Sequence, residues 1–129
     1  MMFTQLPFFL LAGMAAPLTH ADEQSPPAEQ LEFFEKQVRP LLSQHCYECH
    51  SVSAKRIEAN LLLDSRAAHL SGGDSGAAVV PGDAENSPLI EAVRYESFEM
   101  PPQGKLPDRD VEILVRWVNL GAPWPKEEA

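Results

Sequence analysis

Apolar residues recur at helical spacing near the C-terminal end of the chain, from about Asp108 to Leu120. Positions three and four residues apart fall on one face of an α-helix, where they pack against a core. Acidic residues at the start of this stretch and Gly121 after it match the preferred start and stop of a helix. The stretch is therefore predicted to be a helix with a buried stripe of Val111, Leu114, Val115 and Val118, widened by Ile113 and Trp117.

A second helical pattern precedes the first cysteine and contains a proline. Ser25-Pro26-Pro27 stands before the pattern and is a typical helix start. Pro40 lies inside the pattern, and because a proline lacks the backbone N–H of a helix interior, we expect the helix to kink or restart there. The second piece then runs directly into Cys46. The apolar positions of this helix are Leu31, Phe34, Val38, Leu41 and Leu42.

Two shorter helices are predicted between these ends. The first is capped by Asp64 and is stopped by Gly72-Gly73. The second begins at Ser87-Pro88 and ends near Tyr95. The stretch between them, residues 72–86, is rich in Gly, Ser, Asp and Pro, which indicates an ordered loop.

The segment Glu99-Met100-Pro101-Pro102-Gln103-Gly104 is predicted to be a loop. Each proline biases the residue before it toward an extended conformation, so Met100 is presented from extended backbone. No alternating run is long enough to build a sheet. With 129 residues, of which 44% are apolar, the chain has room for one globular domain. The predicted fold class is all-α, a small helical fold with long ordered loops.

The first 21 residues have the composition of a secretory signal peptide. Met1 to Ala21 contains no Asp, Glu, Lys or Arg, and its apolar run is shorter than the ~20 residues that span a bilayer. Thr19-His20-Ala21 places small residues where a signal peptidase reads them. We expect cleavage after Ala21, export to the periplasm or another exported location, and no membrane span. An uncleaved N-terminal anchor is the alternative.

The segment Cys46-Tyr47-Glu48-Cys49-His50 is a C-x-x-C-H motif, which is typical of covalent haem c attachment. Two cysteines three residues apart share a helical face, so both sulfurs can bond to one edge of a porphyrin while His50 binds the iron. A local disulfide or half of a zinc site is the alternative, but the chain has no further cysteine for zinc. A thioredoxin-like pair would need a βαβ context that is missing from the pattern.

Met100 is the candidate for the second axial ligand of the iron. The other methionines, Met1, Met2 and Met14, lie in the predicted leader, so the mature chain would keep only Met100. His69 is an alternative ligand, and a sixth iron position that is open or filled by water is a third possibility. Ligation by His50 and Met100 raises the reduction potential and leaves no vacancy on the iron, which favours electron transfer over catalysis.

The expected role is therefore that of an electron carrier with one covalent haem, and not of an enzyme. A haem-based sensor or a peroxidase-like enzyme with an open or displaceable sixth site is the alternative. The net charge of −9 disfavours nucleic acid and is compatible with a redox partner protein that has a basic docking surface. Arg66 and Arg94 are the better candidates for contact with haem propionates. Trp117 is expected in the core, in contact with the haem.

Several stretches together make the chain resemble the planctomycete-type cytochrome c domain, a branch of the class I cytochrome c fold. Besides the C-x-x-C-H motif and Glu99-Met100-Pro101-Pro102, they are Val38-Arg39-Pro40-Leu41-Leu42, Leu63-Asp64-Ser65-Arg66-Ala67-Ala68, Gly72-Gly73-Asp74-Ser75-Gly76, Val80-Pro81-Gly82 and Trp117 with Gly121-Ala122-Pro123-Trp124-Pro125. The resemblance implies N- and C-terminal helices that cross beside the haem. It also implies thioethers at Cys46 and Cys49 and axial ligation by His50 and Met100.

The expected organisation places the cytochrome domain at residues 31–125. A linker of residues 22–30 would join it to the signal peptide of residues 1–21, and residues 126–129 would form a C-terminal tail.

Overall fold

The computed structural model describes residues 12, 13, 15, 16 and 25–127. The predicted signal peptide, apart from four residues, and the start of the predicted linker lie outside the described residues. Within the described part of the chain, no helix is both long and apolar enough to cross a membrane.

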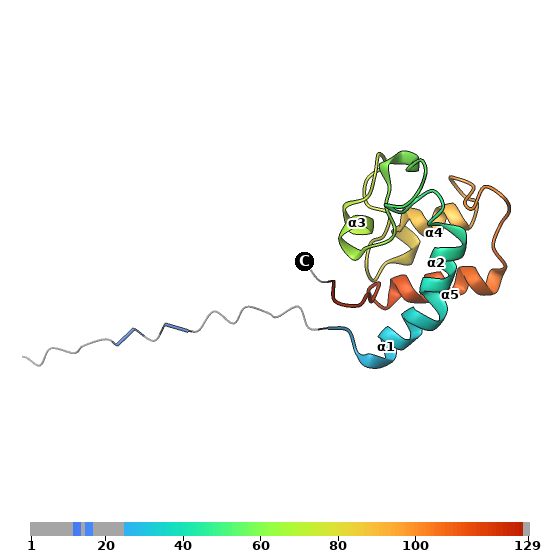
Figure 1. The fold of residues 1–129 in the computed structure, drawn as a ribbon. Helices are drawn as coiled ribbons and strands as arrows, with labels where there is room; N and C mark the ends of the chain where they lie inside the picture. Colours follow the sequence, from blue (N-terminus) through green and yellow to red (C-terminus); the bar gives the residue numbers. More distant parts are fainter. Residues whose placement is uncertain (1–11, 14, 17–24, 128–129) are drawn as a thin grey trace, which may run out of the picture.

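The N-terminal helical run consists of α1 (Ala28–Phe33), the π-helical turn η1 (Phe34–Val38) and α2 (Arg39–His45), which follow one another without a break (Figure 1). The residue that caps α1 is Pro27 and not Ser25, and the Pro27 carbonyl accepts hydrogen bonds from the backbone N–H groups of Gln30 and Leu31. Pro40 lies in the first turn of α2, where a helix does not need its missing N–H. The predicted kink or restart at Pro40 takes the form of a change from a π-helical turn to α-helix at Arg39, and the helical run is not interrupted there.

The helix α3 (Arg66–Ser71) is capped by a different residue from the one predicted. The Ser65 hydroxyl accepts a hydrogen bond from the backbone N–H of Ala68 at 3.1 Å, whereas the Asp64 carboxylate accepts one from the backbone N–H of Val52 at 2.9 Å. Asp64 therefore joins two loops. It does not cap the helix, because its carboxylate is bonded to Val52, which lies twelve residues earlier in the sequence. Gly72 ends the helix as predicted.

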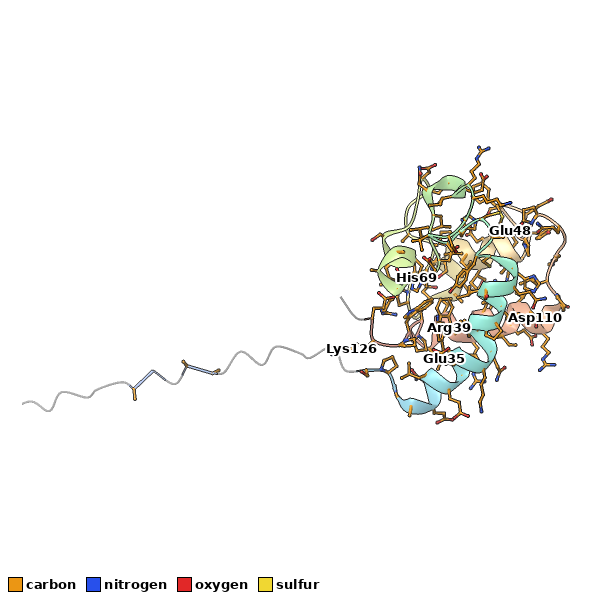
Figure 2. The ribbon with its side chains drawn as sticks, viewed as in Figure 1. Glu35, Arg39, Glu48, His69, Asp110 and Lys126 are labelled. Carbon is orange, nitrogen blue, oxygen red and sulfur yellow. The ribbon has the colours of Figure 1, made fainter. Side chains whose placement is uncertain are left out.

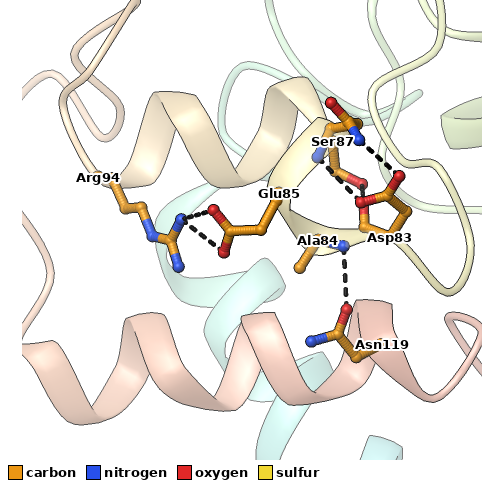
Figure 3. Close-up of polar contacts among 7 residues, drawn as sticks. Asp83, Ala84, Glu85, Ser87, Arg94 and Asn119 are labelled. Carbon is orange, nitrogen blue, oxygen red and sulfur yellow. Dashed lines mark hydrogen bonds and ion pairs between the residues drawn. The ribbon is translucent and has the colours of Figure 1, made fainter.

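The loop before α4 (Pro88–Val93) is held by side chains that bond to backbone (Figure 3). Ser87 precedes the helix as predicted, but its hydroxyl donates to the Asp83 carbonyl at 2.8 Å instead of capping the helix. A short 3-10 turn, η3 (Ala84–Asn86), follows Asp83, and the Ala84 N–H donates to the Asn119 side-chain oxygen at 3.0 Å. Another 3-10 turn, η2 (Glu58–Asn60), lies in the loop before α3.

The last helix, α5 (Asp108–Asn119), ends one residue before the predicted Leu120. It crosses the N-terminal helical run (Figure 1), and the ring centroids of Phe34 in η1 and Trp117 in α5 are 6.1 Å apart. The crossing of first and last helices that the resemblance implies is therefore present. The described residues contain helices, turns and one isolated bridge between Gly73 and Gly76, with no strand, so the all-α prediction is confirmed.

Candidate functional site

A cavity of about 360 Å³ opens between the end of α2, the α4 helix and the loops that connect them. This volume is in the range of ligand and cofactor pockets, which is roughly 300–1,000 Å³. Much of its wall is apolar, so the cavity suits a hydrophobic group. The apolar wall includes Leu61, Leu63, Ala78, Leu89, Val93 and Leu106.

The cysteines lie on one side of this cavity, where the chain leaves α2. The backbone N–H of Cys46 donates to the Leu42 carbonyl at 2.9 Å, and the N–H of His50 donates to the Cys46 carbonyl at 2.9 Å. These bonds continue the helix as a turn, and Cys46, Cys49 and His50 all line the cavity. Helical spacing brings the two cysteines to one surface, as their separation predicts.

Both cysteines are free thiols in the structure. Burial raises the pKa of Cys46 to about 11, with a smaller contribution from Cys49, so this thiol stays protonated at neutral pH. Among the described residues, no group of three or more His, Cys, Asp or Glu side chains is placed to hold a metal ion. The described residues thus form neither a disulfide nor a zinc site in this structure.

His50 is 9% exposed, and its Nδ1 lies 3.1 Å from the carbonyl oxygen of Leu61. A carbonyl oxygen can only accept a hydrogen bond, so Nδ1 carries the ring proton and donates it. The other nitrogen, Nε2, then has a free lone pair. A histidine held by its Nδ1–H in this way is oriented as a metal ligand through Nε2.

Met100 lines the same cavity from the loop after α4. Its backbone N–H donates to the Ala92 carbonyl at 3.2 Å, which attaches this part of the loop to the helix. The segment 99–104 is non-helical, as its prolines predict. The structure thus brings together at one cavity the four residues that the sequence singled out, although fifty positions separate His50 from Met100.

His69, the rival ligand, lies elsewhere in the fold (Figure 2). It is 1% exposed and packs edge-on against Trp117 and Trp124, each with a centroid distance of 5.5 Å. Burial, with a smaller contribution from the Arg66 charge, lowers its pKa to about 4. His69 is absent from the cavity wall, so its position does not support a role as iron ligand.

The two arginines expected near haem propionates are engaged elsewhere, and neither lines the cavity. Arg66 donates through Nη1 to the carbonyls of Ala122 at 2.6 Å and Gly121 at 3.2 Å, which holds the C-terminal segment. Arg94 pairs with Glu85 at 3.0 Å (Figure 3). Their positions do not support the expectation, because backbone carbonyls bind the guanidinium group of Arg66 and the Glu85 carboxylate binds that of Arg94.

Trp117 is a core residue, as expected, but it does not line the cavity. Its indole N–H donates to the Pro123 carbonyl at 2.9 Å. Its ring belongs to an aromatic cluster with Phe34, His69 and Trp124. The expected contact between Trp117 and the haem is therefore not supported, because this cluster holds the ring on α5 away from the cavity wall.

The acidic residues of the cavity wall were not predicted from the sequence. Glu48, Glu58 and Asp74 line it, together with His45, and none of its lining residues is Lys or Arg. Glu48 is exposed within the C-x-x-C-H turn (Figure 2). The Asp74 carboxylate accepts a hydrogen bond from the Asn60 amide at 2.8 Å, which joins two loops at the wall. Glu48 lies inside the C-x-x-C-H motif and Asp74 lies inside a stretch of the family resemblance, so the sequence offered a signal for these two residues.

Comparison with known proteins gives one family. Residues 46–104 match the model of a family described as planctomycete cytochrome C. The matched segment begins at Cys46 and ends four residues after Met100, so it also contains Cys49 and His50. No match was found among curated proteins or among solved structures.

Proposed function

We propose that this chain, whose residues 46–104 match the model of the planctomycete cytochrome C family, is an exported electron carrier with one haem c, ligated by His50 and Met100. A match to a cytochrome c family implies covalently bound haem and haem-based electron transfer. The single haem, the two axial ligands and export are the parts that we propose.

One observation supports the ligand assignment: Cys46, Cys49, His50 and Met100 all line a single apolar cavity. Two thiols on one turn match the two attachment points of haem c. The imidazole offers Nε2, because its Nδ1–H is bonded to the Leu61 carbonyl. The thioether of Met100 comes from a separate loop and would be the second protein ligand of the iron. The residues present therefore fit haem c.

Each of these residues has a separate task in the proposed carrier. When bound, haem c supplies an iron that exchanges one electron. Cys46 and Cys49 would hold the group covalently, and His50 and Met100 would supply the protein ligands of its iron, which would leave no position for oxygen or peroxide. The apolar wall would limit the access of water to the group, and solvent access is one of the factors that set a reduction potential.

The proposal also includes the location and the partner. The charge-free leader of residues 1–21 supports export. The exposed Glu48, together with Asp74 at the cavity, supports a redox partner whose docking surface is basic. Such a surface would be attracted toward the side of the domain where the haem is attached.

An optical spectrum of the purified ferric protein tests the function. We expect a low-spin haem with the weak charge-transfer band of a methionine–iron bond. Met100→Ala should abolish that band and convert the iron to high spin. A wild-type protein that lacks the band and binds small ligands readily would instead support the sensor or peroxidase-like alternative.

A further inference from the structure

The loop that carries Met100 is attached to the chain at two neighbouring points. The backbone N–H of Met100 donates to the Ala92 carbonyl at 3.2 Å, in the last turn of α4. The hydroxyl of Tyr95 donates to the carbonyl of Pro101, the residue that directly follows Met100. One bond to backbone and one bond to a side chain thus hold the loop on either side of the Met100 thioether.

Tyr95 owes its position to a sharp turn after α4. Its backbone N–H donates to the Ala92 carbonyl at 3.0 Å, and its φ angle is +61°. A positive φ is uncommon for a residue with a bulky side chain, so the surrounding bonds must hold this conformation. The Ala92 carbonyl accepts from both Tyr95 and Met100, which ties the turn and the loop to the same point of the helix.

We propose that Tyr95 is a positioning residue for Met100, which rests on the proposed role of Met100 as an axial ligand. Methionine has a flexible side chain, and its thioether is a neutral ligand that other donors can displace. The strength of such a ligand depends on how closely its backbone is held near the iron. The Tyr95 hydroxyl restrains the Pro101 carbonyl, and it thereby limits the motion of the adjacent Met100.

Tyr95 does not line the cavity, so its effect on the iron acts through the loop. A positioning role and a purely structural role differ in what the loss of the bond changes. Loss of a positioning bond changes the competition between Met100 and an added ligand, whereas loss of a structural bond changes only the free energy of unfolding.

The chain contains a matched control for this test. It has two tyrosines, and the hydroxyl of the other one, Tyr47, is buried without a hydrogen-bond partner. Both Tyr95→Phe and Tyr47→Phe remove one phenolic oxygen and keep the ring. Only Tyr95→Phe removes a bond to the loop that carries Met100.

The experiment titrates the ferric, haem-loaded variants with imidazole and follows loss of the methionine–iron band. A hydrogen bond contributes about 1 kcal/mol, so Tyr95→Phe should raise the imidazole affinity about fivefold. Tyr47→Phe should bind imidazole as the wild type does. Equal affinities for Tyr95→Phe and wild type, with the band intact in both, would overturn the role of Tyr95 and leave the carrier function standing.

Two further observations keep the outcomes separate. A wild-type protein without the band would overturn the proposed ligation itself, and the inference about Tyr95 with it. If Tyr95→Phe does not fold, Tyr95→Asn replaces it, because asparagine tolerates a positive φ better than most residues. Tyr95→Asn should show at least the same rise in imidazole affinity, and an unchanged affinity would overturn the inference.

Discussion

The Nδ1 atom of His50 lies 3.1 Å from the carbonyl oxygen of Leu61, a residue eleven positions later in the chain. The backbone N–H of Leu63 donates back to the His50 carbonyl at 2.8 Å. These two bonds hold the segment after the C-x-x-C-H turn beside the imidazole. The ring is thus oriented by the fold before it binds any metal.

This arrangement predicts a specific loss in His50→Ala. Haem-loaded His50→Ala should lose the low-spin spectrum, because the substitution removes the imidazole whose Nε2 is free to bind the iron. Added imidazole should restore it by filling the space that the side chain left. His45→Ala is the control, since His45 lines the same cavity and is not the proposed ligand. A low-spin spectrum of His50→Ala without added imidazole would show that the ligand is misassigned.

His69 predicts a dependence of stability on pH. Its pKa is lowered to about 4 in the folded state, whereas an unfolded histidine has a pKa near 6.5. Between these values the unfolded chain binds a proton that the folded chain does not, so stability is lost as the pH falls from about 6.5 to about 4. The full loss is on the order of 3 kcal/mol, from about 1.4 kcal/mol for each pKa unit.

Denaturant unfolding of wild type and His69→Phe at pH 7 and pH 4 measures this contribution. Phenylalanine keeps a ring between Trp117 and Trp124 and removes the titrating group. The carboxylates that also respond to acid are shared by both proteins, so the difference between them isolates His69. An equal loss of stability in the two proteins between pH 7 and pH 4 would show that His69 does not cause this pH dependence.

Gly72 predicts a local limit on substitution. It combines φ +75° with ψ −162°, a conformation that is essentially restricted to glycine, and an added Cβ would lie 1.7 Å from the Gly76 carbonyl oxygen. Gly72→Ala should therefore lower the free energy of unfolding by about 3 kcal/mol or more. Gly82→Ala is the control, because Gly82 has a similar φ of +82° and open space around it. Its cost should be about 1–2 kcal/mol, and equal costs at the two positions would contradict the clash.

The acidic cavity wall predicts how the reduced protein reacts with small inorganic oxidants. A cationic cobalt complex should react faster at low salt than at high salt, because the carboxylates attract it. Glu48→Gln should slow this reaction roughly twofold, since one nearby charge in water is worth a fraction of a kcal/mol. Glu112→Gln removes the same charge from the exposed side of α5 and should have less effect. Equal effects of both variants would mean that electrons do not leave near Glu48.

The sequence by itself determined the features that depend on neighbours along the chain. Periodic apolar residues predicted α5, and Pro40 predicted a kink or restart within the N-terminal helical run, because both effects act within one or two turns. The prolines around Met100 predicted a non-helical loop for the same reason. The C-x-x-C-H spacing identified the attachment segment, since three residues along a helical turn bring both cysteines to one side.

Only the tertiary structure decided which of the remaining side chains face the cavity. By sequence alone, Arg66 was a candidate for contact with a propionate. In the structure, its guanidinium group donates to the carbonyl of Ala122, 56 positions later in the chain. By sequence alone, His69 was a candidate ligand. In the structure, it is buried against Trp117 and Trp124, which lie far from it in the sequence. Hydrogen bonds and apolar packing act through space, so residues with the same local pattern take different roles when distant segments meet them. The sequence identified Met100 as a candidate ligand in a non-helical loop. Only the fold places this loop at the same cavity as His50.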